Sequence, residues 1–333
     1  MMKNIIQKLV ESIGPSGYET AVRNLVRAEV EALADAVQVD ALGNLIVRKG
    51  SKSKDGLRIM LSAHMDEIGV IATHIDDHGF VRFTTIGGVR PHTLIGGRVR
   101  FVTGVQVVIG GEKLDSPSAL HTFDQMYIDV GATSRATCPV KIGDMAAFER
   151  PFIDMGDRMV AKSMDDRIAV AVLIETLRQL RQSPHELFFV FSTQEEVGLR
   201  GATTAAFGVD PELGISVDVT GSGDTPKGLK MEVGLGKGPA IKVRDGGMLS
   251  DPRLVRVMVE AAEKLGMPYQ LEILEGGTTD ARAMQVSRAG MPAGCVSIPC
   301  RYIHSPSEMV DYHDVQNSLR LLVELLSQPI HLA

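Results

Sequence analysis

Five separate segments of the chain carry histidine, aspartate or glutamate side chains at positions that a sheet would bring together. Four of these segments follow short apolar runs that are typical of strands: His64 follows residues 58–63, Glu195 and Glu196 follow 187–192, Asp218 follows 215–217, and His304 follows 296–298. Asp165 and Asp166 form the fifth segment, at the start of a predicted helix. Because ligands of open α/β sheets collect beyond the carboxyl ends of the strands, all five segments can meet in one crevice.

This set of side chains is suited to binding a pair of metal ions. Imidazole and carboxylate groups bind zinc, cobalt or manganese, and one carboxylate can bridge two ions that lie about 3.5 to 4 Å apart. The two histidines, with Asp165, Glu196 and Asp218, would give each ion an imidazole, a terminal carboxylate and one oxygen of a bridging carboxylate. Glu195 is then left to accept a proton from water, which is the role of a general base.

Each segment has a simpler explanation when it is taken alone. The sequence His64-Met65-Asp66 is more often structural than catalytic. Asp165 and Asp166 would fit the first turn of a helix, where acidic side chains complement the helix dipole. The adjacent glutamates would also fit a solvated pair, although they directly follow an apolar strand. The five segments together favour the metal site far more than any one of them does.

Apolar periodicity predicts a layered α/β domain. Helical spacing at residues 5–10 and 22–33 is followed by strand-like runs at 44–47 and 57–63. From residue 164 onward, helix and strand patterns alternate, which is typical of a mostly parallel central sheet with helices on both faces. The expected helices are 166–181, 202–207, 252–265, 279–288 and 315–326, and the expected strands are 186–192, 213–219, 239–243, 269–274 and 293–298.

Residues 68–157 have a different pattern from the rest of the chain. They contain β-like runs at 69–74, 80–85, 98–108, 126–130 and 145–148, and these runs are separated by turns rich in glycine. This pattern predicts a small all-β barrel or sandwich. We therefore expect a catalytic domain made of residues 1–67 and 158–333, interrupted by a β domain at 68–157.

The composition argues against several classes of protein. The chain has 333 residues and a net charge of −6, and no cluster of Lys and Arg stands out, so nucleic acid is not an expected partner. The longest unbroken apolar run, Ile168–Ile174, is far shorter than the ~18 residues that suggest a membrane span. Cys138, Cys295 and Cys300 have no CxxC spacing, which favours reduced thiols. We expect a cytoplasmic protein with no membrane partner.

Five motifs occur in order along nearly the whole chain. They are HMDEIG at residues 64–69, SMDDR at 163–167, TQEEVGLRGA at 193–202, VDVT at 217–220 and RYIHSP at 301–306. Together they resemble the motifs of the tetrahedral (TET) metalloaminopeptidases. That family contains glutamyl, leucyl, lysyl and deblocking aminopeptidases, and some of its members have been labelled endoglucanases.

The resemblance implies a ligand set for two divalent ions in each subunit. His64 and Asp218 would hold one ion, and Glu196 and His304 would hold the other. Asp165 would bridge the two ions. Zinc is the expected metal, with cobalt or manganese as alternatives.

The resemblance also implies roles around this ligand set. Asp66 would orient the His64 ring, and Glu195 would be the general base. The peptide bond between Asp165 and Asp166 would be cis. The β insertion would be a PA-like dimerisation domain, and the dimers would assemble into a hollow dodecamer.

These inferences predict a metalloaminopeptidase that removes N-terminal residues from peptides. A second hypothesis is a metal-independent, endoglucanase-like glycoside hydrolase that uses Glu195 and Asp218 as its two acids. A third is a structural metal site in an oligomeric scaffold, which is disfavoured because structural zinc sites are closed and usually rich in cysteine.

Residues 276–281 fit either an active-site rim or a glycine turn with Thr279 or Asp280 as a helix cap. The preferred N-terminal residue of the substrate stays open.

Overall fold

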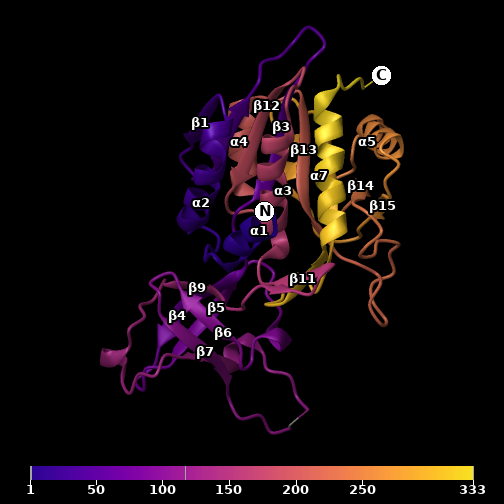
Figure 1. Cartoon of the computed structure of the whole chain (residues 1–333). Helices are drawn as coiled ribbons and strands as arrows, with labels where there is room; N and C mark the ends of the chain where they lie inside the picture. The colour runs from indigo at the N-terminus through magenta and orange to yellow at the C-terminus, as the bar shows by residue number, and fades with distance from the viewer. Residues whose placement is uncertain (1, 117, 333) are drawn as a thin grey trace.

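The chain folds into a larger α/β part and a smaller β-barrel (Figure 1). The computed structural model describes residues 2–116 and 118–332. In Figure 1 the α/β part lies above, and the barrel, drawn in purple, lies below it. The barrel interrupts the α/β part between β3 (Arg58–His64) and the hairpin of β10 (Ile153–Asp154) and β11 (Arg158–Ala161). The fold class expected from the sequence is therefore confirmed.

Eleven strands of the described chain form one mixed sheet, whose centre is parallel. Besides β3 and β11 they are β1 (Ala36–Val39), β2 (Leu45–Lys49), β10 (Ile153–Asp154), β12 (Glu186–Ser192), β13 (Leu213–Thr220), β14 (Ala240–Arg244), β15 (Gln270–Ile273), β16 (Ala293–Arg301) and β17 (Glu308–Asp311). The central strands β12, β3, β13 and β16 are neighbours and run parallel. The strands at both edges pair antiparallel. The central strands read as nearly continuous apolar runs because helices cover both of their faces.

Helices cover both faces of this sheet. The helices are α1 (Met2–Glu11), α2 (Thr20–Val30), α3 (Met164–Gln179), α4 (Arg200–Val209), α5 (Pro252–Lys264), α6 (Asp280–Gln285) and α7 (Tyr312–Ser327), with short 3₁₀ turns at Glu31–Leu33, Pro91–Thr93, Phe123–Gln125 and Arg135–Thr137. On one face α3 packs against α1, α2 and α7. On the other face α4 and α6 pack against each other and the central strands. Within the described ranges, every helix is too short or too polar to cross a membrane.

The smaller part is a closed antiparallel barrel with its own apolar core. Its strands are β4 (Gly69–Ile75), β5 (Val81–Ile86), β6 (Arg98–Phe101), β7 (Gln106–Gly111), β8 (Met126–Asp129) and β9 (Met145–Phe148). They pair around the barrel in the order β4-β5-β8-β7-β6-β9. Val70, Val99 and Ile128 are fully buried inside it. The all-β expectation for this segment holds.

Two expectations for individual strands were wrong. The run at residues 98–108 is a hairpin of two strands, because the chain turns at Gly104, where φ is +97° and the N–H donates to the carbonyl of Phe101. A glycine adopts this conformation without steric cost. The sequence patterns also missed β1, β10, β11 and β17, which are short strands of two to four residues.

A fully buried arginine joins the N-terminal segment to the centre of the sheet. The Arg167 guanidinium, at the start of α3, donates to the carbonyls of Met65 (2.6 Å), Leu9 (2.7 Å) and Ser12 (3.1 Å). Its nearest carboxylate oxygen, Oε1 of Glu67, lies 3.5 Å away. One side chain thus satisfies several backbone acceptors that water cannot reach.

We predict that Arg167→Met lowers the free energy of unfolding in urea by about 3 to 5 kcal/mol, because it leaves several buried backbone carbonyls without their donor and removes a buried positive charge close to Glu67. Arg27→Met is the matched control. Arg27 pairs with Glu31 on an exposed face of α2, so its loss should cost less than about 1 kcal/mol. Equal effects of the two substitutions would show that the buried contacts of Arg167 contribute little.

Candidate metal centre

The parallel strands place the predicted site residues at one edge of the sheet. His64 ends β3, and its partner in the neighbouring strand is Ser192, the last residue of β12. Asp218 lies near the end of β13, the neighbour of β3 on the other side. A cavity of about 430 Å³ opens there, and its wall includes His64, Asp165, Glu195, Glu196, Asp218 and His304. The structure therefore brings together residues from all five segments that the sequence singled out.

The Asp165 carboxylate lies between the two imidazoles. Its Oδ1 is 2.9 Å from Nε2 of His64, and its Oδ2 is 3.3 Å from Nε2 of His304. The same His304 nitrogen lies 3.3 Å from Oε2 of Glu196. Asp165 thus presents one oxygen to each imidazole, which is the arrangement that a bridging carboxylate requires. The peptide bond between Asp165 and Asp166 is cis, as expected.

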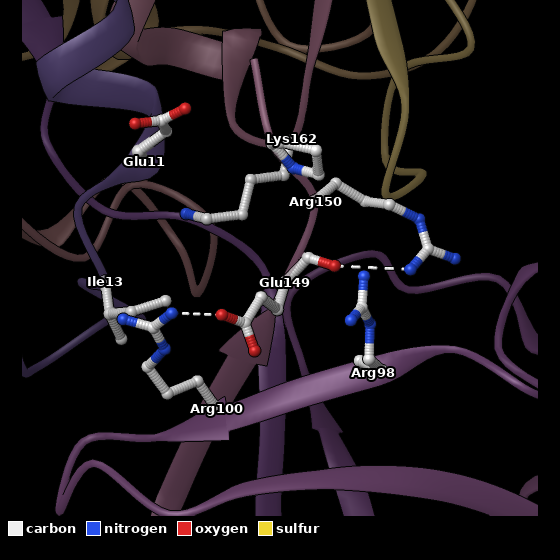
Figure 2. Close-up of a pocket in the computed structure, with 8 residues that line it drawn as sticks. Glu11, Ile13, Arg98, Arg100, Glu149, Arg150 and Lys162 are labelled. Atoms are coloured by element: carbon white, nitrogen blue, oxygen red, sulfur yellow. Dashed lines mark hydrogen bonds and ion pairs between the residues drawn. The ribbon is translucent and has the colours of Figure 1, made fainter.

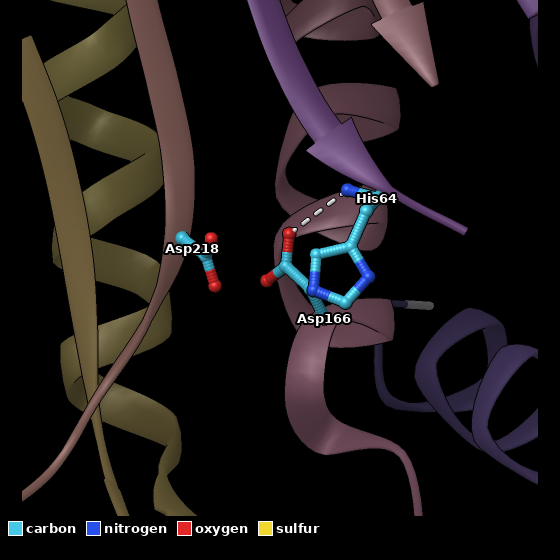
Figure 3. Close-up of side chains that lie close together, drawn as sticks. All are labelled: His64, Asp166 and Asp218. Atoms are coloured by element: carbon cyan, nitrogen blue, oxygen red, sulfur yellow. Dashed lines mark hydrogen bonds between the residues drawn. The ribbon is translucent and has the colours of Figure 1, made fainter. Parts of the chain in front are cut away.

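His64, Asp166 and Asp218 form a second close group (Figure 3). One ligand atom from each of them lies within 4.8 Å of the others, and all three residues are buried. In Figure 3 the Asp166 carboxylate lies between the His64 ring and Asp218. Oδ2 of Asp166 accepts a hydrogen bond from the backbone N–H of His64 at 3.2 Å. Asp166 is therefore a member of this group, a position that the sequence analysis did not predict.

Asp66 connects the His64 segment to the two glutamates. Its carboxylate accepts hydrogen bonds from the backbone N–H of Glu195 (3.0 Å), the backbone N–H of Glu196 (3.2 Å) and the hydroxyl of Ser16 (2.6 Å). Oδ1 of Asp66 lies 3.4 Å from Nδ1 of His64, whereas the Asp66 carbonyl oxygen is closer to that nitrogen, at 3.1 Å. Asp66 therefore faces the ring of His64 and also fixes the loop that carries the glutamates.

Negative charge dominates the electrostatics of the site. Burial raises the pKa of Glu195, of Glu196 and of Asp218, because few charges around them compensate for lost hydration. Burial lowers the pKa of His304, but hydrogen bonds to Asp165 and Glu196 outweigh this and raise the pKa to about 11. Both imidazoles are thus drawn toward the positive form by the surrounding carboxylates. A cation in the cavity would relieve the same imbalance.

Strained backbone conformations occur next to the site. Ser163, Gln194 and His304 all have positive φ values, between 55° and 62°. A non-glycine residue in this region costs roughly 1 to 3 kcal/mol and persists only where the surroundings hold it. Ser163 lies two residues before Asp165, and Gln194 directly precedes Glu195. His304 is itself one of the site residues.

Two buried acids hold the site in place, and sequence analysis gave neither of them this role. Glu308 accepts hydrogen bonds from the backbone N–H of Asp165 (2.9 Å) and from that of His304 (2.8 Å). Asp280 accepts from the hydroxyls of Ser62 and Ser192, on the two strands that lead into the site. Asp280 occurs in the predicted rim segment as a possible helix cap, but no motif marked Glu308, which lies on β17, one of the strands that the sequence patterns missed.

The segment at residues 276–281 fulfils both of its alternative expectations. Gly277, Thr278 and Thr279 line the cavity, as an active-site rim would. The hydroxyl of Thr279 accepts from the backbone N–H of Ala281 and caps α6. The same short segment thus shapes the cavity and starts a helix.

Comparison with known proteins decides the family. The model of the M42 glutamyl aminopeptidase family matches residues 43–321. The chain belongs to this family. It is 44% identical over 328 residues to a putative aminopeptidase of Acetivibrio thermocellus, with 98% of each chain covered. It is 38% identical to the lysyl aminopeptidase of Pyrococcus furiosus, with 97% of this chain and 96% of that one covered. The chain is thus a metal-dependent aminopeptidase.

Solved structures support the same conclusion. The TET1 peptidase of Pyrococcus horikoshii superposes on this M42 aminopeptidase with a TM-score of 0.90 at 32% identity, covering 98% of this chain and all of that one (100%). A structure from Thermotoga maritima that is named as an endoglucanase has a TM-score of 0.81 at 32% identity and covers 97% of this chain and 96% of that one. The resemblance to the TET aminopeptidases is confirmed, and relatives labelled endoglucanase occur as well.

Gly88 allows us to test the position of His304. A side-chain methyl at Gly88 would collide with the imidazole of His304. We predict that Gly88→Ala displaces the ring and lowers kcat/KM on an aminoacyl p-nitroanilide by roughly 10 to 100-fold, as is usual when a support of a metal ligand is lost. Gly208→Ala in α4, where a methyl meets open space, is the control and should leave kcat/KM unchanged. Normal kinetics of Gly88→Ala would contradict a required position of His304.

Proposed function

We propose that this protein removes N-terminal residues from peptides by hydrolysis at a site with two divalent cations. The observation that carries the proposal is the Asp165 carboxylate, which presents one oxygen to His64 and the other to His304 inside a cavity lined by further acids. Such a set of histidines and carboxylates is typical of sites for two metal ions. Zinc is the proposed metal, with cobalt or manganese as alternatives.

Unpartnered buried oxygens in the site fit this proposal. Oε1 of Glu196 and Oδ1 of Asp166 are both buried with no hydrogen-bond partner among the described residues. A buried oxygen without a partner costs free energy, most of all when it is charged. Divalent cations would supply the missing interactions and the missing positive charge.

We assign the ligands to two ions that share Asp165. His64 and Asp218 would hold one ion, and Glu196 and His304 would hold the other. When bound, the ions would polarise the scissile carbonyl and make water a better nucleophile. Asp166 would be a further candidate ligand of the ion held by His64 and Asp218, because its carboxylate lies within 4.8 Å of their ligand atoms.

Glu195 is the proposed general base. Its carboxylate lines the cavity, and its Oε2 lies 3.9 Å from Nε2 of His64, beyond hydrogen-bond distance. The hydrogen bond from its backbone N–H to Asp66 holds it in this position. Glu195 would take a proton from the attacking water and pass it to the leaving amine, which balances the proton count of peptide hydrolysis.

A glycoside hydrolase is the second candidate function, because a solved structure similar to this chain is named as an endoglucanase. Glycoside hydrolysis needs two positioned acids and uses no imidazole ligands. In this cavity two histidines contact the central acid, an arrangement that a glycosidase mechanism leaves without a role. The site chemistry therefore favours the peptidase.

We also propose that the protein forms a homo-oligomer in the cytoplasm. The TET1 peptidase of Pyrococcus horikoshii can assemble into a tetrahedron or a large octahedral shell. By analogy, residues 68–157 would be the dimerisation domain, and dimers would build a dodecamer. The three free cysteines, Cys138, Cys295 and Cys300, are compatible with a reducing compartment.

If Glu195 is the general base, its substitution should lower turnover while metal binding is kept. Glu195→Gln should keep both ions, measured as metal content per subunit, and lower kcat by roughly 10² to 10⁴-fold, which is the usual contribution of a general base. Glu232→Gln, at an exposed position, is the control for loss of a glutamate charge. A Glu195→Gln protein with a nearly normal kcat would exclude this assignment.

Metal removal discriminates between the two candidate functions. After exhaustive chelation, we expect hydrolysis of aminoacyl p-nitroanilides to cease, and added zinc, cobalt or manganese to restore it. A panel of acidic, basic and aliphatic aminoacyl substrates in the same assay would identify the preferred residue. Metal-free protein that still cleaves carboxymethyl cellulose would support the glycosidase instead.

A further inference from the structure

A second cavity of about 450 Å³ lies where the barrel meets the α/β part (Figure 2). The barrel contributes Arg98 and Arg100 from β6, and the segment after β9 contributes Glu149, Arg150 and Pro151. The α/β part contributes Glu11, Ile13 and Lys162. None of these residues belongs to the candidate metal centre, so this cavity is a separate feature of the molecule.

The acids of this cavity are already engaged by neighbouring groups. Oε1 of Glu149 accepts hydrogen bonds from the Arg100 guanidinium and from the amide of Gln106. Oε1 of Glu11 accepts from the backbone N–H of Phe152 at 3.1 Å. These contacts occupy one oxygen of each carboxylate and pair Arg100 with Glu149.

Lys162 is compensated as well. Its ammonium is buried and lies 2.7 Å from Oε2 of Glu67, and it also donates to the hydroxyl of Ser163 and the carbonyl of Ser12. Glu67 is not part of the cavity wall. The positive charge of Lys162 is thus balanced by Glu67, which lies outside the cavity wall.

Two guanidiniums of the cavity have no acidic partner. The Arg98 side chain makes no hydrogen bond or ion pair with any described residue, and the Arg150 side chain donates to one group within the described ranges, the carbonyl of Glu149, at 3.2 Å. In Figure 2 both side chains point into the same part of the cavity, on one side of Glu149. Nε of the neighbouring Arg100 is buried and has no partner among the described residues. Once Arg100 is paired with Glu149 and Lys162 with Glu67, two guanidinium groups and the Glu11 carboxylate remain, so the cavity keeps a net positive charge and a spare donor.

These features match a doubly charged oxyanion. Guanidinium groups bind phosphate oxygens through pairs of parallel hydrogen bonds. A phosphate monoester carries a charge of about −1.5 to −2 at pH 7, which balances two arginines better than a single carboxylate would. The volume also lies within the roughly 300 to 1,000 Å³ of small-molecule sites.

We propose that this cavity is a binding site for a phosphate group, held by Arg98 and Arg150 with Arg100 beside them. Because the wall comes from both parts of the chain, the bound anion would connect the barrel to the catalytic part. The ligand is either free phosphate or a phosphate group on a small molecule, since both present the same oxygens.

Titration calorimetry on the metal-loaded protein tests this site. Inorganic phosphate and AMP are titrated separately to distinguish free phosphate from a phosphate monoester, and acetate is the singly charged comparison. We expect phosphate or AMP to bind, and the double variant Arg98→Gln/Arg150→Gln to bind it at least about tenfold more weakly. Arg320→Gln, which removes an exposed arginine on α7, is the matched control and should bind normally.

A further variant separates this site from the metal centre, which could itself attract phosphate. Glu196→Gln disturbs the metal centre and should keep the phosphate binding that the double arginine variant loses. The proposal is overturned if the double variant binds as tightly as the unmodified protein, if Glu196→Gln alone abolishes binding, or if neither phosphate nor AMP binds. It is also overturned if the double variant changes the oligomeric state without any loss of phosphate binding, because the arginines would then serve a subunit contact. None of these outcomes bears on peptide hydrolysis, so the proposed function is tested independently.

Discussion

The structure depends on one electrostatic constraint: several carboxylates are buried together around Asp165, and the two imidazoles and nearby Lys242 do not balance their charge. Burial raises the pKa of Glu195, Glu196 and Asp218, because these groups have lost water without gaining enough positive charge. Oxygens of Glu196 and Asp166 are left without a partner among the described residues. A fold retains such an arrangement when cations complete it, and divalent ions bring two charges to each position. The chemistry of an M42 aminopeptidase follows from the same constraint.

The scaffold holds these groups in place through backbone hydrogen bonds. Asp66 accepts from the N–H groups of both adjacent glutamates, and Glu308 accepts from those of Asp165 and His304. Acids outside the cavity wall thereby position acids inside it, and an ordered arrangement of this kind costs little reorganisation during reaction. Buried Arg167 and Lys162 fix the segments just beyond, through several carbonyls and Glu67.

The sequence predicted those parts of the site that follow from strand ends. Parallel strands align their carboxyl ends, so His64, Asp218 and the glutamates could be placed at one edge without coordinates. Glu308 could not be predicted, because it lies on a short strand with no continuous apolar run and accepts hydrogen bonds from backbone groups whose position only the fold decides. The basic cavity could not be predicted from the sequence for a related reason. Arg98, Arg150 and Lys162 are separated along the chain, and only the contact between the barrel and the α/β part brings them together.

Anomalous X-ray scattering from crystals of zinc-loaded protein would test the central claim most directly. Our account predicts two peaks per subunit, about 3.5 to 4 Å apart, on either side of the Asp165 carboxylate. One peak should lie beside His64 and Asp218, and the other beside Glu196 and His304. A single peak, or peaks away from Asp165, would contradict the account.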